Sequence, residues 1–163
     1  MQKITAHLWF DNQAEEAMKF YTSVFKDSKI IGIQRYPDES LDEHFKGMAG
    51  KVIHGVFELA GQRFMALDGG PMFKFNEAIS LYVECESQVE VDYFWEKLTA
   101  DGGEESMCGW LKDKYGLSWQ IVPKQLGELM SDQDTEKTGR VTQALMQMKK
   151  IDIARLRQAY EQA

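Results

Sequence analysis

Three histidines are the residues in this chain best suited to acid–base or metal chemistry, because imidazole titrates near neutral pH and also binds metal ions. His7 lies on the same face of a predicted strand as Trp9. There it could act as a general base or a metal ligand, or it could be an ordinary hydrogen-bonded strand histidine. His54 lies in the apolar segment VIHGVF, which favours a core role, and His44 lies in a polar loop.

Asp68 and Cys108 are the other candidates for chemistry. Asp68 ends a predicted strand directly before Gly69-Gly70, a position that suits a site acid and equally a turn residue. A nucleophilic cysteine needs a lowered pKa and a neighbouring base, and no pattern identifies such a base for Cys108. We therefore favour a buried structural thiol. Cys85 and Cys108 have no C-x-x-C spacing, which favours two reduced thiols.

Two segments roughly 75 residues apart have the same pattern, which predicts an internal duplication. Each opens with alternating apolar residues, typical of a strand, and continues with a capping pair and an apolar stripe at helical spacing. The capping pairs are Asn12 with Glu15 and Ser87 with Glu90. The stripes comprise Ala17, Phe20, Tyr21 and Val24 in the first copy and Val91, Phe94, Trp95 and Leu98 in the second.

Further strands are predicted after each helix, and one strand of the second copy is short or missing. They span residues 30–36, 52–59 and 63–67 in the first copy and 107–112 and 117–122 in the second. Beyond Pro123, apolar residues at helical spacing predict three helices. We expect one domain over 1–163, with module one over 1–70, module two over 76–123 and a helical tail over 124–163.

The composition limits the classes of partner. The net charge of −7 opposes binding to phosphate backbones, so we expect no nucleic-acid partner. No apolar run reaches the roughly 18 residues of a membrane helix, so we expect no membrane partner. The opening MQKITAHLWF lacks the zones of a signal peptide, and together these features predict a cytoplasmic protein.

Three stretches of the chain resemble one known family: ITAHLWFDNQAEEAMKFYTSVF, CGWLKDKYGLSWQIVPKQL and ALMQMKKIDIARLRQAY. The duplicated β-α-β-β-β pattern is similar to the vicinal oxygen chelate superfamily of glyoxalase I, extradiol dioxygenases and bleomycin-resistance proteins. The stretches resemble its PhnB-like branch, often labelled 3-demethylubiquinone-9 3-methyltransferase. The resemblance implies an α+β fold in which two modules curl a mixed sheet around a cup, and it implies a homodimer.

The resemblance also implies where a metal would bind. Metal-dependent members carry a His or similar ligand early in the first strand of each module and a Glu in the last strand. Carried over, these positions fall on Thr5, Ala66, Ala78 and Gln120. Alanine has no donor atom, and Thr and Gln are weak neutral donors, whereas divalent metals are normally bound by carboxylate, imidazole or thiolate. We therefore expect no metal and no other cofactor.

Seven residues are predicted to bind a ligand within such a cup: His7, Trp9, Asp68, Ser80, Tyr82, Trp110 and Gln120. The rings of Trp9, Tyr82 and Trp110 suit an aromatic or quinone-like molecule, or they fill the cup as core. Gln120 and Ser80 could hydrogen-bond a carbonyl or hydroxyl group. We expect a metal-independent protein that binds a small aromatic or oxygen-rich molecule, by sequestration or with a simple acid–base reaction.

Three alternatives stay open, and with them the question whether the protein is an enzyme. A divalent-metal lyase or dioxygenase would use His7, His54 and Asp68 as displaced ligands. The methyltransferase label implies S-adenosylmethionine, yet Asp11-Asn12-Gln13 follows the first strand in place of a glycine-rich loop. A non-catalytic module could instead interact with partners through the tail over 124–163.

Overall fold

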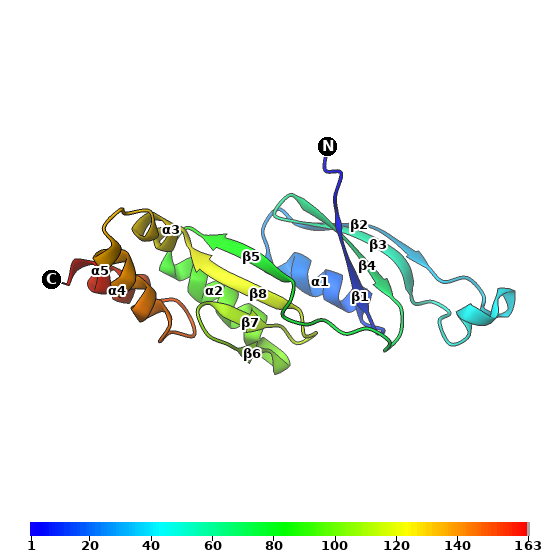
Figure 1. Ribbon diagram of the computed structural model, residues 1–163. Helices are drawn as coiled ribbons and strands as arrows, with labels where there is room; N and C mark the ends of the chain where they lie inside the picture. Colours follow the sequence, from blue (N-terminus) through cyan, green and yellow to red (C-terminus); the bar gives the residue numbers. More distant parts are fainter. Residues whose placement is uncertain (163) are drawn as a thin grey trace. The chain divides into compact units, whose positions relative to one another are not determined.

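Both halves of the chain fold into the β-α-β-β-β module that the duplicated pattern predicts. The computed structural model describes residues 1–162 (Figure 1). The chain divides into two units, Met1–Lys74 and Phe75–Ala163, and each has its own four-stranded mixed sheet with one helix packed on it. The α+β class is confirmed, whereas a single domain over both units stays a prediction.

Unit one has the strand order β1-β4-β3-β2. β1 runs parallel to β4, whereas β3 pairs antiparallel with both β2 and β4. Two short 3-10 turns, Glu39–Leu41 and Glu43–Phe45, lie in the polar loop between β2 and β3. Its regular elements are β1 (Ala6–Phe10), α1 (Ala14–Val24), β2 (Lys29–Arg35), β3 (Val52–Leu59) and β4 (Gln62–Asp68).

One face of this sheet is covered by α1. Tyr21 of the helix stacks on Phe57 of β3, with ring centroids 6.4 Å apart. Gly55 approaches the helix so closely that a Cβ atom there would lie 2.7 Å from the Met18 sulfur. Side chains alternate between the two faces of a strand, so the neighbours of these residues point to the opposite face. That opposite face is here called the open face.

The start of α1 differs from the prediction. The capping role assigned to Asn12 is wrong, because the helix begins at Ala14 and the preceding Gln13 makes no side-chain cap. Instead, the Ala14 N–H donates to Asp68 Oδ1 at the end of β4, over 2.8 Å. A carboxylate from a distant strand thus satisfies a free donor at the helix N-terminus.

Unit two repeats the arrangement with the strand order β5-β8-β7-β6. Its regular elements are β5 (Ser80–Cys85), α2 (Gln88–Thr99), a 3-10 turn (Ala100–Gly102), β6 (Glu104–Glu105), β7 (Trp110–Lys112) and β8 (Ser118–Pro123). The predicted short strand is β6, which has two residues. The cap at Ser87 is confirmed, since its side chain accepts a hydrogen bond from the Glu90 N–H.

The strand predicted over 107–112 begins only at Trp110, because Cys108 and Gly109 adopt positive φ values of 59° and 84°. Their N–H groups donate to the carbonyls of Met148 and Lys149 in the tail, over 2.7 and 2.8 Å. This irregular segment therefore joins the tail to the sheet.

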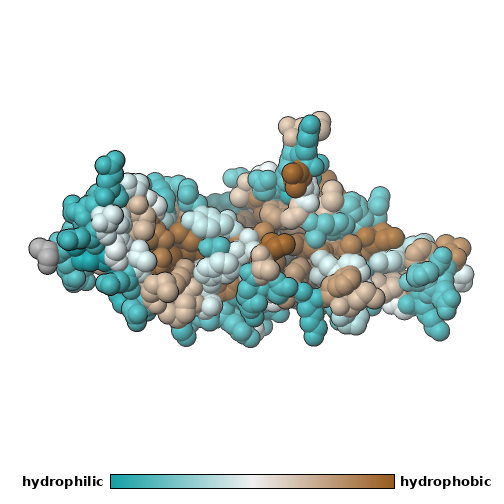
Figure 2. Space-filling model, viewed as in Figure 1, coloured by the Kyte–Doolittle hydropathy of each residue, from teal (hydrophilic) through white to brown (hydrophobic). Residues whose placement is uncertain are grey.

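The tail forms the three predicted helices, α3 (Lys124–Met130), α4 (Thr135–Leu145) and α5 (Ile153–Glu161). Five buried residues form their shared core with β8: Val122, Val141, Met148, Ile151 and Leu156. The outer surface of the tail is mostly hydrophilic in Figure 2. None of the helices within residues 1–162 has the length and hydropathy required to span a bilayer.

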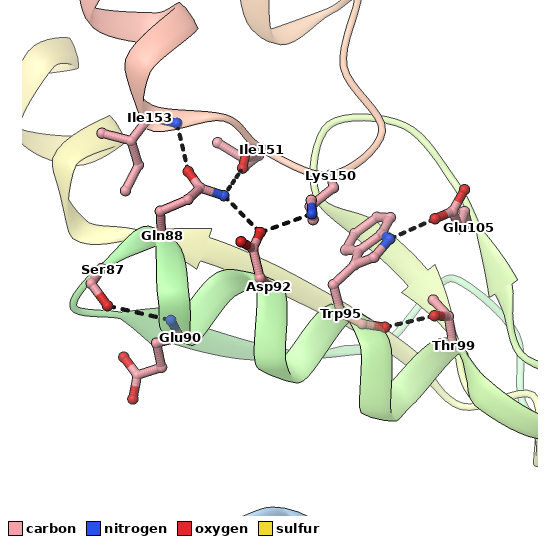
Figure 3. A network of polar contacts seen from close by, with 10 residues as sticks. All are labelled: Ser87, Gln88, Glu90, Asp92, Trp95, Thr99, Glu105, Lys150, Ile151 and Ile153. Atoms are coloured by element: carbon pink, nitrogen blue, oxygen red, sulfur yellow. Dashed lines mark hydrogen bonds and ion pairs between the residues drawn. The ribbon is translucent and has the colours of Figure 1, made fainter.

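A network of polar contacts fastens the tail to α2 (Figure 3). Gln88 Nε2 donates to the Ile151 carbonyl over 3.0 Å, and Gln88 Oε1 accepts from the Ile153 N–H over 2.9 Å. Lys150 forms an ion pair of 2.8 Å with Asp92, one turn along the helix from Gln88. The tail is therefore an integral part of unit two.

Candidate functional site

The open face of unit one holds the two strand histidines. The rings of His7 and His54 lie edge to face with centroids 5.7 Å apart, although β4 separates their strands. Partial burial and the neighbouring His54 both lower the pKa of His7 below its usual value, and a hydrogen bond with the Ala66 backbone partly opposes them. His7 is therefore suited to a neutral imidazole near pH 7 that can donate or accept one hydrogen bond.

Trp9 lies on the same open face but is held by the segment that follows β4. Its indole N–H donates to the Gly70 carbonyl over 3.0 Å, and its ring packs edge to face against Phe73 with centroids 4.9 Å apart. A Cβ atom at position 69 would lie 2.2 Å from the indole, so only glycine fits there. These contacts give Trp9 a structural role besides any contact with a ligand.

Asp68 lies apart from this face. Its carboxylate is 3% exposed, and besides Ala14 it accepts the Val52 N–H at Oδ2 over 2.9 Å. Both oxygens are thus occupied by backbone donors on the side of the sheet that faces α1. The proposed metal set of His7, His54 and Asp68 is therefore not brought together.

The ligand position assigned to Ala66 also needs correction. Ala66 pairs with Gly55, whose Cα faces α1, and it is fully buried. The assignment is wrong by one residue, because alternation along β4 places Met65 and Leu67 on the open face instead. Neither carries a nitrogen or oxygen donor.

In unit two, the sheet face that points away from α2 is likewise called the open face, and it brings together the other four predicted residues. Trp119 and Ile121 are buried beneath α2, so Gln120 between them points to the open face. Gln120 pairs with Tyr82 of β5 on one side and with Trp110 of β7 on the other. Its Nε2 donates to Ser80 Oγ over 2.9 Å.

The two rings therefore flank an amide–hydroxyl pair. Tyr82 is 56% exposed, although the partial burial of its phenol raises the pKa of that group above its usual value. An exposed ring beside hydrogen-bonding groups can bind a flat molecule that carries oxygen atoms.

A hollow of about 170 Å³ adjoins this face of unit two, and its lining includes Trp110, Lys112, Ser118 and Glu77. Lys112 forms an ion pair with Glu77 at the rim. The Ser118 hydroxyl is buried without a hydrogen-bond partner among residues 1–162. Ser118 was not among the predicted site residues, although the alternation of LSWQIVP places it two residues before Gln120 on the same strand face.

The most recognisable stretch of the sequence, CGWLKDKYGLSWQIVP, has a structural role besides carrying Trp110, Ser118 and Gln120. Asp113 is 2% exposed and accepts hydrogen bonds from the N–H groups of Tyr115 and Leu117 and from the Trp119 indole, over 2.9, 3.1 and 2.9 Å. Cys108 contributes a weak contact of 3.6 Å from its Sγ to the Leu145 carbonyl. The motif therefore builds the β7–β8 turn and the junction with the tail.

Comparisons with known proteins place both modules in one family. The family model for 3-demethylubiquinone-9 3-methyltransferase matches residues 2–122. A PhnB protein from Bacillus cereus is 43% identical with a TM-score of 0.67, over 75% of this chain and 99% of its own. Protein PA1353 from Pseudomonas aeruginosa, at 18% identity and a TM-score of 0.57 over 76% and 98%, has the same fold.

A fosfomycin resistance protein, FosX, from Listeria monocytogenes is 16% identical with a TM-score of 0.49, over 73% of this chain and 91% of its own. No curated protein matches the chain. The family match ends at residue 122, so the resemblance over the tail stays a prediction. Over its two modules, the chain belongs to the 3-demethylubiquinone-9 3-methyltransferase family of PhnB-like proteins.

Proposed function

We propose that this protein binds a small aromatic or oxygen-rich molecule on the open face of the unit-two sheet, without a metal ion. The observation that carries the proposal is the Gln120–Ser80 pair between two partly exposed rings, Tyr82 and Trp110. A flat ligand would cover apolar ring surface, which favours binding by roughly 25 cal/mol per Å².

Hydrogen-bonding capacity remains free for the ligand at this pair. With Gln120 Nε2 donating to Ser80 Oγ, the Ser80 hydroxyl hydrogen and Gln120 Oε1 remain available. One donor and one acceptor side by side suit a carbonyl next to a hydroxyl. This arrangement supports an oxygen-rich ligand over a purely apolar one.

The donor set supports metal-independent binding. A catalytic zinc site normally has three protein ligands, supplied by His, Cys, Asp or Glu. His7 and His54 provide two imidazoles, and the four predicted residues of the unit-two face provide an amide, two hydroxyl groups and an indole, none of them a usual zinc ligand. Among residues 1–162, no three His, Cys, Asp or Glu side chains are grouped so that they could bind one ion.

The methyltransferase in the family name would require S-adenosylmethionine. In unit one, Asp11-Asn12-Gln13 links β1 to α1 without the glycine-rich turn that lets a cofactor approach the backbone. Both sheets are also small and mixed rather than doubly wound and parallel. These features favour a binding protein that does not use this cofactor.

Calorimetry and NMR on chelator-treated protein test the proposal. The panel should contain 4-hydroxybenzoate, 4-hydroxyacetophenone, a methoxyhydroquinone and S-adenosylmethionine. We expect one of the phenolic compounds to bind and to shift the Trp110 indole signal, with at least tenfold weaker binding in Tyr82→Ala and Gln120→Leu. Tyr93→Ala, a change of a partly exposed tyrosine on α2, is the matched control and should leave binding unchanged.

Elemental analysis of the protein purified without chelators tests metal independence separately. We expect a metal-to-protein ratio near zero after incubation with Zn, Ni, Mn and Fe(II). A ratio near one, or phenol binding that appears only after metal loading, would contradict the proposal and favour a metal-dependent lyase or dioxygenase.

We also propose a cytoplasmic homodimer, which the sequence resemblance supports. Light scattering should then give twice the 18.8 kDa mass of one chain, and a value of 18.8 kDa at micromolar concentration would refute the dimer.

A further inference from the structure

The charged residues that line the hollow beside Trp110 in unit two are mostly acidic. Three carboxylates, those of Glu77, Glu104 and Glu105, line it together with a single ammonium group, that of Lys112. The excess of negative charge matches the sign of the whole chain, whose net charge is −7. A concave surface with an excess of negative charge attracts cations and repels anions.

The charged groups that line the hollow differ in how freely they can interact with a ligand. Lys112 is paired with Glu77, and Glu105 accepts a hydrogen bond of 2.7 Å from the Trp95 indole. Glu104 is exposed and lies opposite Lys112 in the β6–β7 ladder. The Glu104 carboxylate is therefore the acid most accessible to a ligand, although it also interacts electrostatically with Lys112, the lining lysine that is paired with Glu77.

An independent observation points to a polar ligand atom. Ser118 is 1% exposed, lines the hollow, and its hydroxyl has no hydrogen-bond partner within residues 1–162. A buried hydroxyl without a partner is destabilising, so such groups are usually satisfied by water or a ligand. A donor that enters the hollow and reaches Ser118 Oγ would remove this penalty.

We propose that the hollow receives the protonated primary amine of the ligand. The ammonium group would donate to Ser118 Oγ and to the Glu104 carboxylate, while the adjoining carbon atoms lie against the Trp110 ring. The volume of about 170 Å³ accommodates a group of this size but not a large molecule. The inference rests on the proposed function for the location of the site, and it identifies the ligand as a primary alkylamine that carries an aromatic ring.

A bound metal ion is a poorer occupant. The carboxylates of the hollow belong to no group of three His, Cys, Asp or Glu residues, within 1–162, that could bind one ion. An organic cation, in contrast, needs only one carboxylate, one hydroxyl and an aromatic surface.

The test compares 2-phenylethylamine with 2-phenylethanol, which have nearly the same size but differ in charge at pH 7. We expect the amine to bind at least tenfold more tightly by calorimetry. This preference should shrink as the salt concentration rises from roughly 0.05 to 0.5 M, because screening weakens the interaction between the ammonium group and the carboxylate. Both ligands should shift the Trp110 indole signal in NMR spectra.

Two variants and one control test whether the amine group of the ligand binds in the hollow. Glu104→Gln and Ser118→Ala should each remove most of the preference for the amine while leaving the affinity for the alcohol unchanged. Within residues 1–162 the Ser118 hydroxyl has no hydrogen-bond partner, and Glu104 is exposed, so both variants should fold and thermal unfolding should confirm this. Glu84→Gln, at an exposed acid of β5 outside the hollow, should preserve the preference.

The outcomes separate this inference from the proposed function. Equal binding of the amine and the alcohol at Trp110 would overturn the inference and leave the proposed function intact. A preference that survives Glu104→Gln and Ser118→Ala, or falls equally in Glu84→Gln, would overturn it in favour of general charge attraction. Failure of the amine to bind would overturn it as well, and the phenol panel then decides the proposed function by itself.

Discussion

Replacing Asp68 should destabilise unit one strongly, because this carboxylate joins the start of α1 to the start of β3. Its Oδ1 accepts the Ala14 N–H over 2.8 Å and its Oδ2 accepts the Val52 N–H over 2.9 Å, at 3% exposure. A hydrogen bond to a charged group contributes about 1.5–3 kcal/mol to stability. Asp68→Ala should therefore lower the free energy of unfolding by about 3–5 kcal/mol, since both N–H donors lose their acceptor.

Asp68→Asn should have an intermediate cost of about 1.5–3 kcal/mol, because the amide retains one acceptor oxygen and presents an NH2 group to the second donor. The matched control is Asp11→Asn, at an exposed acid near the same helix end, which should change stability by less than about 0.5 kcal/mol.

Urea unfolding followed by circular dichroism measures the total change in the free energy of unfolding. Hydrogen exchange at the Ala14 and Val52 amides measures whether the loss is local. A loss below about 1 kcal/mol in Asp68→Ala, or unchanged exchange at both amides, would refute the structural role. Loss of ligand binding in Asp68→Asn at unchanged stability would instead restore Asp68 as a site acid.

Three further predictions follow from single contacts. Burial raises the pKa of the Cys85 thiol to about 12, so a thiol reagent at pH 8 should modify Cys108 alone, and two equivalents of rapid labelling would contradict this. The pKa of His7 should lie below 6.5 in an NMR titration and rise in His54→Gln, which removes the neighbouring imidazole that lowers it. Because the unfolded chain takes up this proton more readily, His7 should reduce stability as pH falls below 6.5. Gly109→Ala should destabilise unit two by about 1–3 kcal/mol in thermal unfolding, because φ is +84° there and the added Cβ would lie 2.8 Å from an isoleucine of the tail; an unchanged Tm would show that the tail adjusts.

The elements that were predicted well are those specified by neighbouring residues. The alternation of β1 and the stripe of α1 depend only on which positions are apolar, and the boundaries of β3 agree with the prediction. Ser87 caps α2 as predicted, because its acceptor and the Glu90 N–H are three residues apart. The same local pattern gave a wrong cap at the start of α1, because the acceptor there is the Asp68 carboxylate, 54 positions away in the sequence.

The candidate site was predicted in part. Strand alternation predicted the faces of Tyr82 and Trp110, and the position carried over from the family resemblance predicted Gln120. Pairing between β5, β8 and β7 makes the three residues neighbours. The aligned position of Ala66 was off by one residue, since a register in β4 follows from pairing with β3 and not from local pattern.

The sequence by itself determined the duplicated module, the faces of its strands, the three tail helices and the scarcity of metal donors at the compared positions, because periodicity and side-chain chemistry are local properties. Only the tertiary structure decided the contact between His7 and His54, the use of Asp68 as a cap, and the unpaired Ser118 hydroxyl beneath an acidic rim. Each of these depends on chain segments far apart in sequence, and the burial or partner that they create arises only when strands pair and helices pack.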